Sequence, residues 1–231
     1  MTSPIYLDYA AATPVDNAAR RVAEPYLSEQ FYNPSAVYQP ARMVRQAIEE
    51  ARAQVADVLG AKDQEIYFTA GGTEANNLAI HGIMKQYSDA HMIVSSVEHE
   101  SVLEPAQQYS HDIAPVLPSG LIDITALERL IRPETVLISV MYANNEVGTI
   151  QPLRRLVELV NSLRTQRLKS SNTRPLYIHT DACQAANYLD LHVSRLGIDL
   201  MTLNGGKIYS YKQSGCLYLS KRVDVSPLVL G

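Results

Sequence analysis

The chain has 231 residues, of which 46% are hydrophobic and 19% are charged. This length and composition allow a sizeable buried core, which excludes a disordered tail, a collagen-like fibre and a disulfide-stapled miniprotein. The 20 Lys and Arg residues against 24 Asp and Glu residues give a net charge of -4, so no positive surplus is present for a nucleic-acid backbone. We therefore predict no nucleic-acid partner. We also predict no membrane association, because no apolar run approaches the roughly 20 residues that span a bilayer.

Two cysteines, Cys183 and Cys216, are too few for a disulfide framework and lack the spacing of a metal site. Such sparse cysteines are typical of a reducing compartment. The first residues, Met1 to Asp8, contain neither a basic segment nor an apolar segment, so they predict no signal peptide. Together these observations predict a cytoplasmic protein without a metal.

Short β-rich runs alternate with longer helical stretches along the chain. Apolar residues recur at helical spacing over 39–60, and Gly60 predicts the end of that helix. Helical patterns return at 73–87, after the capping residues 123–125, and after Pro152, which is typical of a first helical position. Strands are predicted at 65–69, 92–95, 136–141, 176–180, 200–203 and 216–219.

This alternation predicts an α/β fold with a mostly parallel sheet and helices on both faces. The nearly continuous apolar run 136–140 agrees with a strand that is buried on both sides, and the polar segment 169–175 predicts an exposed loop. In such a sheet, ligands bind beyond the carboxyl ends of the strands. Polar clusters follow five predicted strands, at 71–74, 98–100, 144–146, 181–184 and 204–207.

The first polar cluster begins with Gly71 and Gly72, followed by Thr73. Glycines let the backbone approach a ligand closely, and a helix start with a hydroxyl beside it can cradle a phosphate. An ordinary strand-to-helix turn is an equally good interpretation. The cluster is neither a dinucleotide fingerprint nor a P-loop, because no G-x-G-x-x-G is present and no Gly-Lys-Ser/Thr follows.

The next polar clusters offer a carboxylate, an imidazole and two amides. Asp181 ends a buried run, where it could pair with a protonated heteroaromatic nitrogen or cap a helix. His99 could stack on a planar ligand or exchange protons, or it could be a structural hydrogen-bonding residue. A metal site at 98–100 is excluded on the expectation that adjacent residues of a strand point to opposite faces. Asn144 and Asn145 suit ligand oxygens or a turn.

Lys207 follows a Gly-Gly turn after a predicted strand. A lysine beside a bound electrophile can form a Schiff base, although a solvated surface lysine is the alternative. Cys183 has no basic partner nearby in the sequence and is more typical of a small buried residue than of a nucleophile. A phosphate cradle, a stackable imidazole, a carboxylate for a ring nitrogen and a lysine amine together specify pyridoxal 5'-phosphate (PLP) as the cofactor.

Seven linked motifs also carry a resemblance to a known family. In chain order they are YLDYAA (6–11), NPS (33–35), FTAGGTEANNLA (68–79), EH (98–99), NNEVG (144–148), HTDACQA (179–185) and GKIY (206–209). The chain resembles the cysteine desulfurases, within the class V aminotransferases of PLP fold type I. The resemblance extends to the last residue and implies a PLP-binding large domain over 1–231, with an N-terminal arm over 1–20.

The resemblance implies a role for each matching residue. Lys207 is expected to form the Schiff base and His99 to stack over the cofactor ring, which makes both catalytic. Asp181 is expected at the pyridine nitrogen, Gln184 on the side of the ring hydroxyl, and Asn145 near the ring and the substrate carboxylate. The expected cofactor-binding residues are Gly72, Thr73, His99, Asn145, Asp181, Gln184, Asn204 and Lys207.

Two stretches around the lysine depart from the family's pattern. The family usually has Ser-x-His-Lys, whereas this chain has Asn204-Gly205-Gly206-Lys207. Asn204 can still donate a hydrogen bond to a phosphate, but Gly206 has no side chain to do so. After the lysine, the family's Gly-Pro-Lys-Gly turn is replaced by SYKQSG at 210–215. These departures weaken the expected phosphate contacts and the expected positioning of Lys207.

Family members also have the size of two domains. Their nucleophilic cysteine and the arginine that binds the substrate carboxylate belong to the C-terminal part, and neither Cys183 nor Cys216 matches that cysteine. We therefore expect a C-terminally truncated chain without the small C-terminal domain.

The resemblance implies the conversion of L-cysteine to L-alanine, with persulfide sulfur left on a cysteine. L-cysteine or a related amino acid is then the substrate, and a homodimer, a sulfur-acceptor protein and iron-sulfur cluster assembly are the implied context. Because the nucleophile is not matched, we expect weak or no activity from this chain alone. Two alternatives stay open: a non-catalytic PLP-fold interaction module, and a selenocysteine lyase or aminotransferase of the same class.

Overall fold

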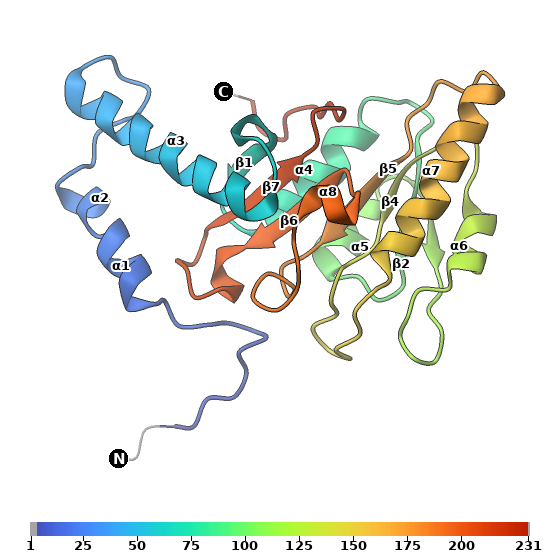
Figure 1. Ribbon diagram of the computed structural model, residues 1–231, viewed down its shortest axis with the longest axis horizontal. Helices are drawn as coiled ribbons and strands as arrows, with labels where there is room; N and C mark the ends of the chain where they lie inside the picture. The colour runs from blue at the N-terminus through green and yellow to red at the C-terminus, as the bar shows by residue number, and fades with distance from the viewer. Residues whose placement is uncertain (1–3, 231) are drawn as a thin grey trace.

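A computed structural model describes residues 4–230 (Figure 1). Met1, Thr2 and Ser3, on which the signal-peptide prediction partly rests, lie outside these described residues, as does Gly231. The described chain forms seven strands: β1 Ile66–Thr69, β2 His91–Ser95, β3 Ser110–Ala114, β4 Thr135–Ser139, β5 Tyr177–Asp181, β6 Leu200–Asn204 and β7 Gly215–Leu219.

The strands of residues 4–230 form one sheet in the order β1-β7-β6-β5-β4-β2-β3. Strand β2 pairs in parallel with β3 and β4, and β5 pairs in parallel with β4 and β6. Strand β7 runs antiparallel to both of its neighbours, β6 and β1. The predicted mostly parallel α/β sheet is confirmed, and its parallel strands bring their carboxyl ends to one edge.

Helices cover both faces of the sheet, and each face has its own core. Alternate residues of a strand point to opposite faces, so Ile93 enters one core while Met92 and Val94 enter the other. The first core also contains apolar residues of α3, α6, α7 and α8, and the second contains those of α4 and α5. The helices are α1 Asn17–Ala23, α2 Pro25–Ser28, α3 Gln39–Leu59, α4 Gly72–Met84, α5 Glu100–Ala106, α6 Ile124–Leu130, α7 Leu153–Lys169 and α8 Val193–Leu196.

Most predicted elements have the expected positions within a residue or two. Helix α3 ends at Leu59, and Gly60 follows in the left-handed conformation with φ 61°, which glycine adopts without strain. Helix α6 begins after the capping residue Asp123, whose side chain accepts the Ala126 N–H. Pro152 is the N-cap of α7 rather than its first helical residue. The predicted loop at 169–175 is formed by residues 170–175, because Lys169 is the last residue of α7.

Strand β3 and helix α5 were not predicted from the sequence. Strand β3 begins with Ser110, His111 and Asp112, and it lies at one end of the sheet. An edge strand needs no apolar residues on both sides, so its sequence is not distinguished from a loop. Helix α5 has only 7 residues, and Pro105 lies inside it, which hides the helical pattern.

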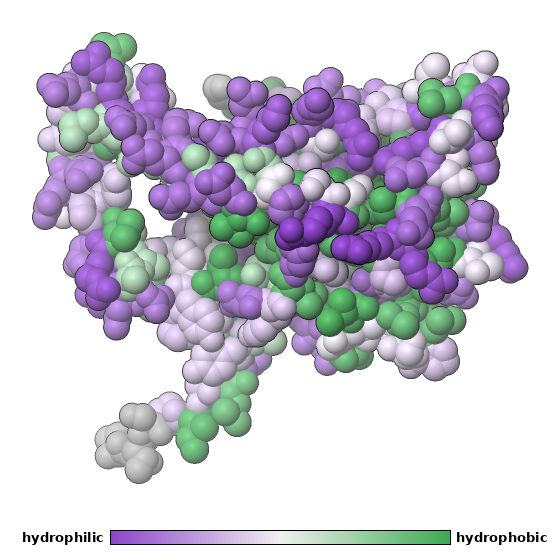
Figure 2. Space-filling view, in the orientation of Figure 1, coloured by the Kyte–Doolittle hydropathy of each residue, from purple (hydrophilic) through white to green (hydrophobic). Residues whose placement is uncertain are grey.

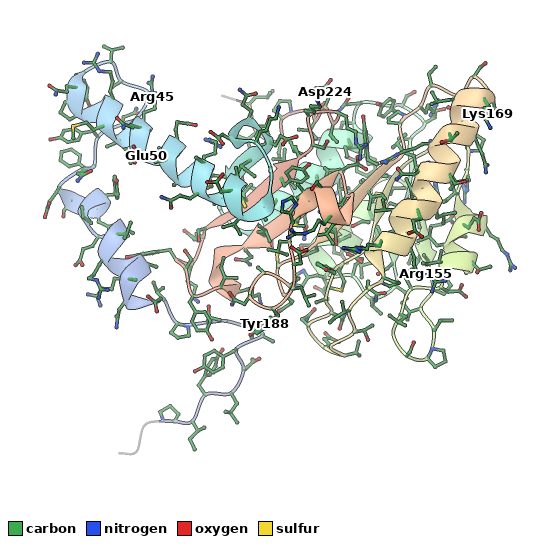
Figure 3. All side chains as sticks on the ribbon, viewed as in Figure 1. Arg45, Glu50, Arg155, Lys169, Tyr188 and Asp224 are labelled. Atoms are coloured by element: carbon green, nitrogen blue, oxygen red, sulfur yellow. The ribbon has the colours of Figure 1, made fainter. Side chains whose placement is uncertain are left out.

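The N-terminal part projects from the body of the molecule in Figure 1. An extended segment precedes α1, which begins at Asn17 within the expected arm, and Asp16 caps it by accepting the Ala18 N–H at 2.6 Å. Ile5 and Leu7 are 88% and 84% exposed, and hydrophobic surface lies along this segment in Figure 2. Charged side chains such as Arg45 and Glu50 lie along α3 in Figure 3. Between residues 4 and 230, no helix is both long and apolar enough to cross a bilayer.

Candidate functional site

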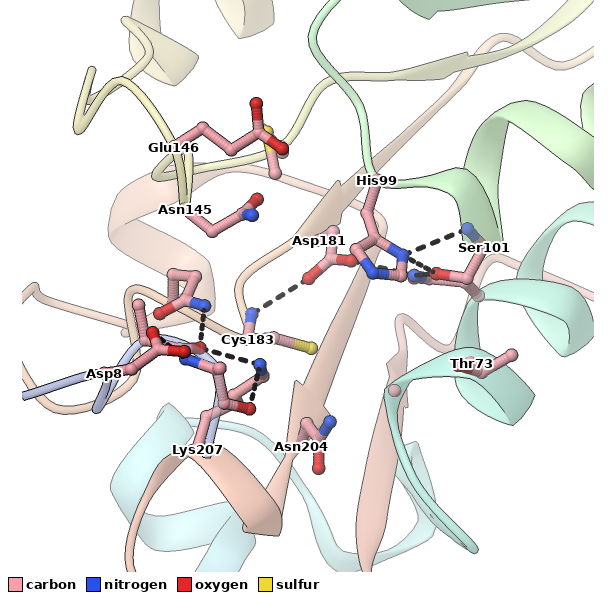
Figure 4. Close-up of a pocket in the computed structure, with 16 residues that line it drawn as sticks. Asp8, Thr73, His99, Ser101, Asn145, Glu146, Asp181, Cys183, Asn204 and Lys207 are labelled. Carbon is pink, nitrogen blue, oxygen red and sulfur yellow. Dashed lines mark hydrogen bonds between the residues drawn. The ribbon is translucent and has the colours of Figure 1, made fainter. Parts of the chain in front are cut away.

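A pocket of about 400 Å³ lies at the carboxyl ends of the parallel strands (Figure 4). Side chains reach this strand-end pocket from the end of β5, from the turn after β6, from the start of α4 and from the N-terminal segment. The structure brings all eight expected cofactor-binding residues to this one pocket. They are Gly72, Thr73, His99, Asn145, Asp181, Gln184, Asn204 and Lys207.

Asp181 is the last residue of β5 and is only 6% exposed. Its Oδ1 accepts the Cys183 N–H at 2.9 Å, so it caps the turn after β5. The alternative of a helix cap is wrong, because the next helix is α8, whose N-cap is His192. Its Oδ2 accepts the Asn76 side-chain amide at 2.8 Å. None of the ion pairs within residues 4–230 includes Asp181. A buried carboxylate with neutral donors alone favours a ligand atom that carries positive charge.

Sequence reasoning missed Asn76 and Ser101. The Asn76 Nδ2 donates to Ser101 Oγ at 2.8 Å as well as to Asp181, while Asn76 Oδ1 has no partner among the described residues. Asn76 is fully buried and lies three residues after Thr73 on α4, beside the buried Ala75. A buried helix position that holds an amide needs polar partners. That polar residue on an otherwise apolar helix face was the available signal.

His99 is the N-cap of α5 and not a strand residue, so the strand argument used against a metal at 98–100 is wrong. Its Nδ1 accepts the Ser101 N–H at 3.0 Å and lies 2.8 Å from Ser101 Oγ. Because Nδ1 is an acceptor, the hydrogen of the neutral ring is on Nε2. In Figure 4 the ring lies beside Asp181. Across residues 4–230 no group of three or more His, Cys, Asp or Glu side chains is placed to hold a metal.

Glu98, which was not predicted as a site residue, joins the ends of β2 and β4. Its Oε1 accepts the Ser95 hydroxyl at 2.7 Å and the Met141 N–H at 2.6 Å, and its side chain is buried. Burial raises the pKa of Glu98 to about 8, and the nearby Asp181 carboxylate adds to this rise while the two hydrogen bonds oppose it. At neutral pH Glu98 therefore carries a proton next to the strand-end pocket.

The two adjacent asparagines have different positions: Asn144 holds a turn, and Asn145 lines the pocket. Asn144 Oδ1 accepts the N–H groups of Glu146 and Val147, each at 2.8 Å. Asn144 Nδ2 donates to the Val97 carbonyl at 2.9 Å, which fastens this turn to the chain before His99. Asn145 lines the pocket instead. The turn chemistry of one amide therefore presents the other to a ligand.

The start of α4 approaches the pocket through two glycines. Gly71 has φ 151°, a conformation that other residues rarely adopt. A Cβ on Gly72 would lie 2.8 Å from Cys183 Sγ, so any larger residue there would have to displace the Cys183 side chain. Gly71 is the N-cap of α4 and has no side chain. Among residues 4–230 no side chain caps the first turn of this helix. The first N–H groups of α4 are therefore left for an acceptor such as a phosphate.

Lys207 ends a short 3-10 turn, Gly205–Lys207, directly after β6. Its Nζ donates to the carbonyls of Ala10 and Ala11 at 2.7 and 2.8 Å, and Gln184 Nε2 donates to the Ala10 carbonyl at 2.8 Å. We call residues 8–13 the arm segment. These contacts were not predicted, because no pattern in the sequence relates the arm segment to a lysine almost two hundred residues away.

Thr13 fastens the arm segment to the turn that carries Lys207. Its N–H and its hydroxyl both lie 3.1 Å from the Gly206 carbonyl, and its Oγ1 accepts the Tyr209 N–H at 2.8 Å. Thr13 is 3% exposed. In the turn itself, Asn204 Oδ1 accepts the Gly206 N–H at 2.9 Å. The N-terminal segment therefore forms one wall of the pocket.

Both cysteines are free thiols, and neither is a ready nucleophile. Burial raises the pKa of Cys183 well above its usual range, and the adjacent Asp181 carboxylate raises it further. Burial raises the pKa of Cys216 to about 11. Both thiols therefore stay protonated at neutral pH.

A parallel α/β sheet with an amine, a buried carboxylate and an uncapped helix start around one pocket is typical of enzymes that bind a phosphorylated cofactor. The Aminotransferase class-V family matches residues 5–231. The chain belongs to this family, whose members depend on PLP, and the predicted family is confirmed.

The curated relatives of this chain include cysteine desulfurases. The protein named cysteine desulfurase IscS of Dictyoglomus turgidum is 40% identical over 238 residues, which cover 100% of this chain and 58% of the relative. IscS of Methanosarcina thermophila is 39% identical over 234 residues, covering 98% of this chain and 55% of the relative. The chain thus spans little more than half the length of these relatives.

Solved structures agree with this relationship. The structure of SspA in complex with cysteine has a TM-score of 0.85 at 36% identity, covering 97% of this chain and 64% of SspA. A NifS-like protein has a TM-score of 0.90 at 29% identity, covering 98% of this chain and 62% of the other. The fold of this chain therefore corresponds to rather more than half of each of these proteins.

Proposed function

We propose that this chain binds PLP in the strand-end pocket and forms the cofactor-binding part of a cysteine desulfurase. The observation that carries the proposal is the buried Asp181 carboxylate, which has neutral donors alone and shares its pocket with the Lys207 amine. PLP, when bound, supplies an electron-accepting ring for chemistry at the α-carbon of an amino acid.

Different side chains around the pocket would hold different parts of that cofactor. Asp181 would hold a proton on the ring nitrogen, and its orientation is maintained by Asn76 and by the Cys183 N–H. His99 would present a flat face to the ring, with its hydrogen on Nε2. These groups are fixed by hydrogen bonds before any ligand arrives, which reduces the cost of ordering them on binding.

The remaining expected residues would contact the periphery of the cofactor. Thr73 and the first N–H groups of α4 would donate hydrogen bonds to the phosphate, with Asn204 beside them. Gln184 would lie towards the ring hydroxyl and Asn145 towards the carboxylate of a substrate. The placement of all these residues around one pocket supports the assignment.

Lys207 would provide the amine that attaches to the aldehyde carbon of the cofactor. In this structure its hydrogens are directed to the carbonyls of Ala10 and Ala11. Attachment therefore requires Lys207 to leave the arm segment. The same arm segment would cover the lysine and limit the access of water.

L-cysteine is the substrate that the comparisons favour, since the relatives are named cysteine desulfurases and SspA was solved with cysteine. In this chain Cys183 is half-buried and Cys216 is buried, and both thiols have raised pKa values, which do not suit attack on a substrate sulfur. We therefore propose that the 231-residue chain alone does not complete desulfuration. Pairing of two copies, transfer of sulfur to an acceptor protein in iron-sulfur cluster assembly, and a cytoplasmic location belong to the same proposal.

The protonated state of both thiols also favours a second candidate, a PLP-fold module that acts by binding a partner. The two candidates differ in how they treat an amino acid. A desulfurase part loaded with PLP changes its visible spectrum with L-cysteine, whereas an interaction module binds PLP without a response to L-cysteine. A response to L-selenocysteine or to an amino-group acceptor in preference to L-cysteine favours the other members of the class.

The test is a titration of the purified chain with PLP, followed by dialysis and a visible absorbance spectrum. We expect a band that survives dialysis in the native chain and is lost in Lys207→Ala. Lys169→Ala is the control, because Lys169 is exposed at the far end of α7 (Figure 3). Borohydride reduction followed by mass spectrometry should then find the cofactor on Lys207. A native chain without the band, or a Lys207→Ala chain that keeps it, contradicts the proposal.

A further inference from the structure

A second hollow of about 830 Å³ adjoins the strand-end pocket. The two cavities share Gly72, Thr73, Asn204 and Lys207 on their linings. A ligand in the pocket therefore has one end open to this outer hollow. Because α4 begins at Gly72, that open end faces the first turn of the helix.

Lys212 lines the outer hollow opposite the start of α4. The aliphatic stem of Lys212 lies beside Gly206. A Cβ added at Gly206 would lie 3.7 Å from Lys212 Cδ, an ordinary van der Waals distance. A Cβ at this position would therefore touch the lysine stem without displacing it. Its Nζ donates to the Thr13 carbonyl, and an ammonium has three donors. Two N–H groups remain for a ligand at the edge of the hollow.

The charges on the outer hollow favour an anion. Lys207 and Lys212 are its two cations, and Glu74 is its carboxylate. Glu74 Oε2 accepts the Ala70 N–H at 2.6 Å, so this carboxylate is turned back onto the glycine turn. If Lys207 attaches to a carbonyl ligand, its amine is committed to that carbonyl group rather than to an anion in the hollow. Lys212 is then the cation that remains beside the first turn of α4.

We propose that Lys212 binds the phosphate group of the cofactor in the outer hollow, together with Thr73 and the first N–H groups of α4. This inference rests on the proposed function, and it assigns the two lysines to two different groups of one ligand. Lys207 takes the carbonyl group, and Lys212 takes the phosphate monoester on the neighbouring ring carbon. A charged donor compensates for the side chain that Gly206 does not provide, since charge-assisted hydrogen bonds are the stronger ones.

The first test compares PLP with pyridoxal, which has no phosphate, in the native chain and in Lys212→Met. Methionine keeps an unbranched stem beside Gly206 but removes the charge. We expect the preference for PLP over pyridoxal to fall about tenfold in Lys212→Met. The affinity for pyridoxal itself should not change. Lys212→Arg should retain the preference, and the exposed Lys169→Met should match the native chain.

The second test uses inorganic phosphate alone and measures the melting temperature of the chain. Phosphate should raise the melting temperature of the native chain and of Lys169→Met, and much less that of Lys212→Met. A native chain without any response to phosphate overturns the assignment of Lys212. An equal loss of PLP and pyridoxal binding in Lys212→Met also overturns it, because Lys212 then acts through Thr13. Phosphate protection that depends on Lys212, in a native chain that never attaches PLP, supports this inference and contradicts the proposed function instead.

Discussion

Two walls of the strand-end pocket are held in different ways. On one wall the side chains of Asp181, Asn76, Ser101 and His99 form a strand-end network of hydrogen bonds, rooted in β5, α4 and α5. On the other wall Lys207 and the arm segment meet through backbone carbonyls. The first wall consists of side chains on regular elements, whereas the second joins a turn to an extended segment.

This difference indicates which parts of the pocket can move. Asp181 and Asn76 are buried, so the hydrogen bond between them cannot break without leaving buried polar groups unpaired, which is costly. A backbone carbonyl of the arm segment can exchange one donor for another, or for water, at small cost. The network would therefore fix the orientation of the proposed ligand, while the arm segment could release Lys207. The following predictions test that contrast, from the largest expected effect to the smallest.

Glu98→Gln should change the pH dependence of stability more than any other substitution. The ordinary pKa of Glu98 is 4.5 in the unfolded chain and is raised to about 8 by burial. Between these values the unfolded state binds fewer protons than the folded state, so stability falls as pH rises, by about 1.4 kcal/mol per pH unit. Glutamine mimics the protonated acid and removes this loss.

Urea unfolding of the native chain and of Glu98→Gln at pH 5, 6, 7 and 8 measures the difference. The two chains should be similar near pH 5 and diverge steadily towards pH 8. Glu104→Gln, an exposed position on α5, is the control and should follow the native chain. Parallel curves for the native chain and Glu98→Gln would mean that Glu98 is not held in its neutral form.

Asp181→Asn should weaken PLP binding by roughly tenfold to a hundredfold. The amide keeps the size of the side chain and can still accept the Cys183 N–H, but it removes the charge. A hydrogen bond to a charged group contributes about 1.5–3 kcal/mol, which sets the expected range. Asp190→Asn, on the surface, should bind PLP as the native chain does. The measurement is a titration with PLP, followed by absorbance, and equal affinities would remove Asp181 from the site.

Asn76→Ala should lower the free energy of unfolding by about 2 kcal/mol, because Asp181 and Ser101 each lose a buried partner. The neighbouring Asn77→Ala is the matched control on the same helix. Asn77 donates to the Thr73 carbonyl within α4, so its loss should cost about 0.5 kcal/mol or less. Urea unfolding compares the two. Similar losses for both positions would place Asn76 outside any network.

Thr13→Val should have the smallest effect on global stability, at about 1 kcal/mol or less. The substitution keeps the shape of the side chain and removes the acceptor of the Tyr209 N–H. Its effect should instead be local, as faster hydrogen exchange of the Tyr209 amide. Thr165→Val, on the exposed face of α7, is the control. Unchanged exchange at Tyr209 would show that the arm segment is not held through Thr13.

The sequence predicts those parts of the molecule that local patterns determine. The helix α3 has apolar spacing and a terminal glycine, and the buried strands are rich in β-branched residues. The pocket residues follow from the rule that ligands bind at the carboxyl ends of parallel strands. Strand β3 is not predicted from the sequence, because an edge strand with polar residues has the composition of a loop.

The unpredicted parts of the site share one physical cause. Asn76 meets Asp181 and Ser101 only because α4 and α5 pack on the same face of the sheet, and no local pattern encodes these contacts. The contacts of Lys207 with Ala10 and Ala11 likewise join residues from the two ends of the chain. From the sequence, Glu98 was considered for a role only as a metal ligand. Its burial depends on contact with the neighbouring end of β4, which no local pattern encodes.

The cap of α5 limits which residues selection can accept at position 99. Phenylalanine, tyrosine or tryptophan would supply a flat ring but no acceptor for the Ser101 N–H. Asparagine, aspartate or serine would supply the acceptor but no ring. His99 meets both demands with one side chain, and it does so only while Nδ1 carries no proton. If His99 stacks on the cofactor as proposed, the start of this helix and the face of the pocket place two demands on one residue, and a substitution that meets only one of them loses the other.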